Sequence, residues 1–269
     1  MPVINVNQIQ LHYTEAGNGE PLILIMGLGS GGDKWEKHMA VYQNHFHCIA
    51  LDNRGAGLSS PPDSESLTTE QMAEDTIALM DALHIESAHI HGISMGGAIA
   101  QIIAAHCPER VRSLILTSTF AHASNSFRRA IGILRDTYGR IDGSTFSHLL
   151  NWMIWSESYH EHHYDLLLAS EQEDSLRPNP MSISAFRAQC NACINHNVSA
   201  ELSNISAPTL VARGDTDLLA PMHITDELVE NIPGAQSYVC HGGGHVHHWE
   251  FLDEFNAATL AFLLEHRKE

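Results

Sequence analysis

The sequence is poor in the features that mark secreted, membrane-spanning and nucleic-acid-binding proteins. Its 269 residues contain five scattered cysteines and no run of about 20 apolar residues, so we expect free thiols and no transmembrane helix. The first residues lack a basic segment followed by an apolar one, which predicts a cytoplasmic protein. Lys and Arg number 14 against 32 Asp and Glu, a net charge of −18 that disfavours nucleic acid and anionic membranes as partners.

Apolar runs and helical patterns alternate along much of the chain. The runs at 21–26, 46–51, 88–91, 111–117 and 208–213 are continuous enough to be strands covered on both faces. Helical patterns lie between most of them, as in a sheet built with crossover connections. The sequence therefore predicts an α/β fold with a mostly parallel central sheet flanked by helices.

The pattern changes from residue 120 to residue 205. This segment is rich in His, Ser, Met and aromatic residues, has helical periodicity, and contains no clear buried strand. We predict a helical cap at 120–205, inserted between strands of a core formed by 1–119 and 206–269. Its most apolar side chains either wall an acyl pocket or form the cap's own core, and they are Phe146, Trp152, Met153 and Trp155.

A G-x-S-x-G pattern at 92–96 follows an apolar strand and opens a helix of small residues. A strand that turns sharply into a helix presents the side chain at the turn, Ser94, above the sheet edge. The free N–H groups and the positive dipole end of the helix face this serine and would stabilise an anion there. Ser94 is therefore a candidate nucleophile.

A serine hydroxyl needs a base within hydrogen-bond reach, and a carboxylate to orient that base. Two loops that follow later strands carry a carboxylate and a histidine, so the three side chains occur along the chain in the order Ser, Asp, His. The acid is a choice between Asp215 and Asp217. The base is a choice among the four histidines of the last loop, which are His241, His245, His247 and His248.

Five segments together make the chain resemble the serine-nucleophile branch of the α/β-hydrolase fold superfamily over nearly its full length. They are MGLGSGGDKW (26–35), DNRGAGLSS (52–60), GISMGG (92–97), GDTDLLAP (214–221) and GGGHVHHWE (242–250). The similarity is greatest to small bacterial carboxylesterases, methylesterases and 3-oxoadipate enol-lactonases. We expect Asp52 and Arg54 of the second segment to hold loops together, because this motif occurs whatever the substrate.

The resemblance selects among the open alternatives. It implies Asp217 as the acid, with Asp215 a turn residue, and His245 as the base. It also implies an oxyanion hole made by the backbone N–H groups of Leu28 and Met95. Many relatives carry His-Gly where this chain has Met-Gly at 26–27, a change in a side chain next to the donating backbone.

The expected activity is hydrolysis of a small-molecule carboxylic ester or lactone through an acyl-enzyme on Ser94. We expect neither a metal nor a cofactor in this chemistry. The same three side chains also serve carbon–carbon bond hydrolases of ring-cleavage products, which is the alternative function. A ligand-binding protein without catalysis is a further alternative, and the oligomeric state is not predicted.

Several other His and Cys residues are expected to be structural. Cys190 and Cys193 are interpreted as neighbours one turn apart on a cap helix, because no second pair accompanies them. The histidines at 160–163 lack metal-binding helical spacing and are expected on a solvated face. Solvated side chains are also expected for His12, His38 and His45.

Overall fold

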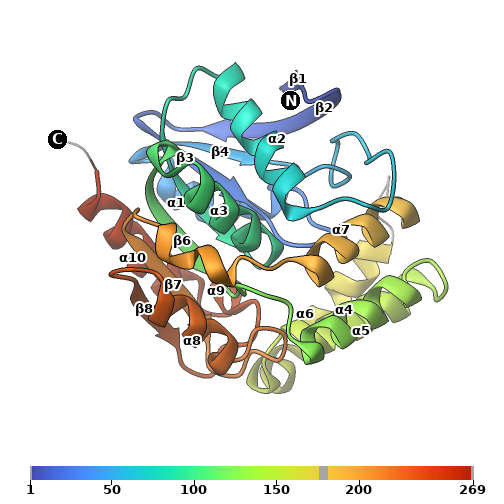
Figure 1. Cartoon of the computed structure of the whole chain (residues 1–269). Helices are drawn as coiled ribbons and strands as arrows, with labels where there is room; N and C mark the ends of the chain where they lie inside the picture. Colours follow the sequence, from blue (N-terminus) through green and yellow to red (C-terminus); the bar gives the residue numbers. More distant parts are fainter. Residues whose placement is uncertain (1, 176–180, 268–269) are drawn as a thin grey trace.

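The computed structural model describes residues 2–175 and 181–267. Eight strands form one sheet in the order β1-β2-β4-β3-β5-β6-β7-β8, with helices on both sides (Figure 1). The β1–β2 and β2–β4 pairs are antiparallel, and the remaining pairs are parallel. This is the mostly parallel, helix-flanked sheet that the alternation in the sequence predicts.

The strands are β1 Val3–Val6, β2 Ile9–Ala16, β3 Glu20–Ile25, β4 Phe46–Leu51, β5 Ala88–Ile93, β6 Val111–Thr117, β7 Thr209–Gly214 and β8 Gln236–Cys240. Strands β3 to β7 lie on the five predicted apolar runs, with bounds within two residues of them. The α-helices are α1 Glu36–Tyr42, α2 Thr69–Ala82, α3 Met95–His106, α4 Asn125–Thr137, α5 Gly143–Ile154, α6 Glu157–Ser175, α7 Ile183–Asn195, α8 Met222–Asn231, α9 His247–Glu250 and α10 Leu252–Glu265. Short 3₁₀ helices span Gly32–Trp35, Pro108–Arg110 and Ser199–Asn204.

Strand β3 shows why its apolar run is continuous. Ile23 and Ile25 belong to the core on one face of the sheet, whereas Leu22 and Leu24 belong to the core on the other face. Successive side chains of a strand point to opposite faces, so a strand covered on both sides needs apolar residues at every position. Helices α2 and α3 cover the first face, and α1 and α10 cover the second.

Helices α4 to α7 lie between β6 and β7 in the chain and gather on one side of the molecule (Figure 1). We call residues 120–205 the cap segment. Phe146 and Met153 are buried in the larger core, whereas the side chain of Trp152 is 62% exposed and therefore serves neither predicted role. Cys190 and Cys193 are buried free thiols on α7, as expected.

The prediction of solvated side chains is wrong for His12 and His38. His12 Nδ1 lies 2.7 Å from Asp52 Oδ2, and both side chains are buried. His38 bonds Asn256 through Nδ1 (2.6 Å) and His248 through Nε2 (3.0 Å). Polar partners from distant segments make burial of these rings tolerable, and such partners leave no periodic pattern in a sequence.

Within the described ranges, no helix is both long and apolar enough to cross a bilayer.

Candidate active site

Ser94 occupies the sharp turn between β5 and α3. Its backbone has φ +54° and ψ −118°, a conformation that side chains rarely adopt and that costs roughly 1–3 kcal/mol. At the neighbouring glycine positions there is no space for the methyl group that any other residue would add. A Cβ atom at Gly92 would lie 2.3 Å from Gly96 O, and one at Gly96 would lie 2.1 Å from Ile25 O. The glycines of the motif therefore permit the close packing that holds the serine in this turn.

The ring of His245 reaches Ser94 from the loop after β8. Its Nε2 lies 3.0 Å from Ser94 Oγ, although the two residues are 151 positions apart in the chain. Ser118, at the end of β6, donates a hydrogen bond from Oγ to the His245 carbonyl oxygen at 2.7 Å. This contact anchors the backbone that carries the ring.

Asp217 lies on the opposite edge of the same ring. His245 Nδ1 is 2.9 Å from Asp217 Oδ2, and the carboxylate also accepts the backbone N–H groups of Leu219 (2.8 Å) and Ala220 (2.9 Å). Burial raises the pKa of the Asp217 carboxyl, but the His245 ring and these N–H groups outweigh burial and leave the pKa below its ordinary value. Asp217 is thus a buried anion whose charge is compensated by the His245 ring and by two backbone N–H groups.

The other residues that the sequence offered as alternatives contact other groups. Asp215 pairs with His241 at 2.9 Å, and the His241 side chain is 85% exposed. Asp215 also accepts the Gly242 N–H at 2.6 Å, as a turn residue would. His247 and His248 are buried among aromatic rings, where both approach Phe255.

Two backbone segments border Ser94 on the side where an oxyanion hole is predicted. Met95 is the first residue of α3, so its N–H has no partner within the helix. Leu28 lies in a tight turn in which Ser30 N–H donates to Gly27 O and Gly29 has φ +73°. A Cβ atom at Gly27 would lie 3.2 Å from Ser94 Cβ, so this turn packs directly against the serine.

A family model described as alpha/beta hydrolase fold matches residues 20–252 of this chain. The chain belongs to the α/β hydrolase family. The 2-hydroxy-6-oxo-6-phenylhexa-2,4-dienoate hydrolase of Burkholderia cepacia is 31% identical, with 96% of this chain and 92% of that protein aligned. The putative carbamate hydrolase RutD of Caulobacter sp. (strain K31) is 27% identical over 94% of each chain. These similarities support a hydrolase that acts on a small molecule.

Among solved structures, the enol-lactonase from Burkholderia xenovorans LB400 superimposes with a TM-score of 0.86. Its sequence is 27% identical, and the alignment covers 98% of this chain and all of that one. The α/β-hydrolase fold predicted from the sequence, with a mostly parallel sheet flanked by helices, is thereby confirmed.

Asp52 and Arg54 hold loops together in this α/β hydrolase, as the sequence predicts. Asp52 accepts the N–H groups of Gly32 (2.6 Å) and Leu58 (2.8 Å) in addition to its contact with His12. Arg54 makes two hydrogen bonds to the buried Asp75, at 2.9 and 2.7 Å. The Arg54 guanidinium is therefore already engaged with a carboxylate.

The cap segment touches the loop that carries His245. Val246 N–H donates to Ile154 O at 3.1 Å, and Glu250 accepts Ser156 N–H (2.7 Å) as well as Gly244 N–H (3.2 Å). A Cβ atom at Gly244 would lie 2.7 Å from Ile154 O. The end of α5 thus packs closely on the loop that holds the base candidate.

Sequence reasoning missed three residues that contact the site's loops, namely Ser118, Phe186 and Gln189. Phe186 and Gln189 lie one turn apart on α7, so the sequence indicates that they share a helix face. It does not indicate that this face contacts the turn that carries Leu28. Phe186 packs on the Leu28 turn, since a Cβ atom at Gly29 would lie 3.0 Å from Phe186 Cε2. Ser118 contacts the loop of the base candidate, because its Oγ donates to the His245 carbonyl oxygen.

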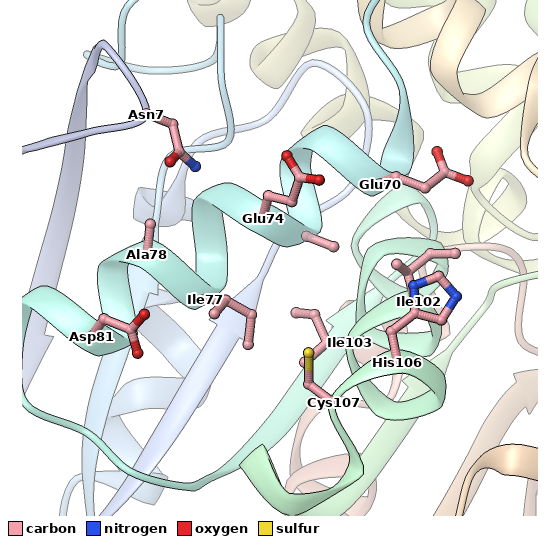
Figure 2. A pocket seen from close by; sticks show the side chains of 11 residues that line it. Asn7, Glu70, Glu74, Ile77, Ala78, Asp81, Ile102, Ile103, His106 and Cys107 are labelled. Atoms are coloured by element: carbon pink, nitrogen blue, oxygen red, sulfur yellow. The ribbon is translucent and has the colours of Figure 1, made fainter.

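A surface hollow of about 470 Å³ lies between α2 and α3 (Figure 2), and Ser94 is not among the residues that line it. Its floor contains Ile77, Ile102 and Ile103, and its rim carries Glu70 and Asp81. Its α3 residues begin at Ile102, roughly 10 Å along the helix from Met95 at 1.5 Å per residue. The hollow is therefore separate from the candidate active site.

In the described ranges, no group of three or more His, Cys, Asp and Glu side chains is arranged to hold a metal ion. The side chains at 161–163 are exposed on α6, as the sequence predicts for this histidine-rich face.

Proposed function

We propose that this α/β hydrolase cleaves a carboxylic ester or lactone of a small molecule through an acyl-enzyme on Ser94. The observation that carries the proposal is the continuous set of hydrogen bonds from Ser94 Oγ through the His245 ring to Asp217. Nucleophile, base and orienting carboxylate need this mutual geometry, and the 3.0 Å contact permits proton transfer within the site.

The reaction proceeds in two halves. His245 Nε2 takes the Ser94 proton as Oγ attacks the carbonyl carbon, and the N–H groups of Leu28 and Met95 donate to the oxyanion. His245 then protonates the leaving oxygen, which departs as an alcohol or, from a lactone, stays attached as a free hydroxyl group. Water, deprotonated by His245, adds to the acyl-enzyme; Ser94 recovers its proton as the acid is released.

The buried carboxylate has a defined part in this cycle. Asp217 holds His245 with Nε2 toward Ser94 and stabilises the imidazolium that forms in each half. Its lowered pKa keeps it ionised at neutral pH, so its charge is present when the ring becomes positive. We place the acyl group of the substrate beneath the cap segment, because α7 packs on the Leu28 turn and α5 packs on the His245 loop.

The test compares wild-type protein with Ser94→Ala at pH 8 on p-nitrophenyl acetate, p-nitrophenyl hexanoate and γ- and δ-lactones. We expect turnover of at least one class by the wild type and loss of about 10⁴-fold or more in the variant. A fluorophosphonate should add one covalent group to the wild type, at Ser94, as measured by mass spectrometry. Absence of both turnover and labelling would contradict the proposal.

The second candidate is carbon–carbon bond hydrolysis, which the name of the Burkholderia cepacia relative favours. The dienoate named there is an anion. Arg54 is joined to the Leu28 turn through Gln189, but its guanidinium is already bound to Asp75, which favours the neutral ester or lactone. Turnover of 2-hydroxy-6-oxo-6-phenylhexa-2,4-dienoate with a kcat/KM above that of every ester and lactone tested would select this alternative.

A further inference from the structure

Gln189 of α7 joins the cap segment to two loops of the core. Its side chain is fully buried. Its Oε1 accepts the Gly29 N–H at 2.9 Å, and its Nε2 donates to Arg54 O at 2.9 Å. One buried amide thus uses its acceptor on the Leu28 turn and a donor on the 52–60 loop.

These hydrogen bonds fix the orientation of the turn that carries Leu28. The Gly27–Leu28 peptide is held through Gly27 O, which accepts Ser30 N–H at 3.3 Å. The next peptide, Leu28–Gly29, is held through its N–H by Gln189. With both peptides fixed on either side of Leu28, its N–H direction is set before substrate arrives, which is what an oxyanion donor requires.

We propose that Gln189 is a positioning residue that orients the Leu28 N–H for the oxyanion. The inference rests on the proposed function, since it concerns an oxyanion that forms at Ser94. It assigns to the cap segment a part in transition-state stabilisation in addition to covering the substrate. The Leu28 donor acts in the transition state, so loss of Gln189 should lower kcat more than it raises KM.

The first test compares Gln189→Met with the wild type and with Asn191→Ala. Methionine keeps the length and removes both hydrogen bonds. Asn191 lies on the same helix and donates to Glu65 O at 3.0 Å, so its loss weakens cap attachment without touching the Leu28 turn. We expect kcat to fall about 10- to 100-fold in Gln189→Met, with KM within threefold, and to stay within threefold in Asn191→Ala.

A second variant separates positioning from packing. In Gln189→Glu, a neutral carboxylic acid can still accept from Gly29 and donate to Arg54 O, whereas the ionised form cannot donate. The kcat ratio of Gln189→Glu to wild type should therefore rise as pH falls from 8 to 6. The same ratio for Gln189→Met should stay constant over this range.

The outcomes are distinct. Equal kcat losses in Gln189→Met and Asn191→Ala, or a pH-independent Gln189→Glu ratio, would overturn the positioning role while leaving the proposed function intact. The rate of fluorophosphonate labelling of Ser94 is measured in the same variants as a second readout, because labelling requires the same oxyanion site. A wild type that is neither active nor labelled would reject the proposed function and this inference with it.

Discussion

The loops after β7 and β8 hold two Asp–His pairs built from the same atoms at the same distance. Asp215 and His241 are 2.9 Å apart, as are Asp217 and His245. The side chains of the first pair are 33% and 85% exposed, and those of the second are 1% and 7% exposed. Hydrogen-bond length therefore does not distinguish the two pairs, whereas burial does.

Burial changes what each pair can do. An exposed pair is surrounded by water and contributes about 0–1 kcal/mol to stability. The buried Asp217 needs further donors, and it takes them from Leu219 and Ala220. The buried ring also has a second partner, Ser94, on its far nitrogen. A fixed ring between an anion and a hydroxyl is the arrangement that acid–base catalysis requires.

The largest expected difference between the pairs concerns their histidines. His245→Ala should lower kcat by about 10⁴-fold or more, because no base then accepts the Ser94 proton. His241→Ala should leave kcat within twofold. Steady-state hydrolysis of the best p-nitrophenyl ester measures both, and comparable losses in the two variants would remove the distinction between the pairs.

The buried histidines should couple the stability of the fold to pH. Burial lowers the pKa of His38 and His247 to about 4, so the folded protein keeps both neutral while the unfolded chain binds protons near pH 6.5. Stability should therefore be full above about pH 7 and fall as pH drops from 6.5 toward 4, by up to about 1.4 kcal/mol per pH unit for each such group.

Urea unfolding at pH 7.5, 6.5 and 5.5 measures this predicted fall in stability. His38→Gln should flatten the pH dependence by removing one buried ring. A midpoint that stays constant from pH 7.5 to 5.5 in the wild type would show that the buried rings are not held neutral.

A smaller effect is expected from the serine that anchors the buried pair. Ser118→Ala leaves His245 O without its donor, which should cost about 1–3 kcal/mol and lower kcat about tenfold by loosening the ring. Ser113→Ala is the matched control on β6, since it breaks the buried 2.7 Å bond to His89. Ser113→Ala should lose a similar amount of stability but keep the wild-type kcat. Equal kcat values in Ser113→Ala and Ser118→Ala would refute the anchoring role.

The sequence predicted what depends on local pattern. Apolar runs located five of the strands, with β4 and β6 at the predicted ranges, and the glycine spacing located the turn at Ser94. It did not separate the two Asp–His pairs, which are 26 and 28 positions apart and fit equally well. The choice of Asp217 and His245 came from family resemblance.

What the sequence could not show are contacts between polar atoms far apart in the chain. Gln189 and Gly29 are 160 positions apart, and a hydrogen bond across that distance has no periodicity. The buried His12 and His38 were misjudged for the same reason, because their partners, Asp52 and Asn256, come from distant segments. Such groups come together only in the folded chain.

The most direct test of the central claim is the rate of fluorophosphonate labelling of Ser94 in Asp217→Asn and Asp215→Asn at pH 8. If the buried pair activates the serine, Asp217→Asn should label about 10³-fold or more slowly than wild type, since the ring loses its orientation and its compensating charge. Asp215→Asn should label within twofold of wild type. Equal rates in the two variants would contradict the account.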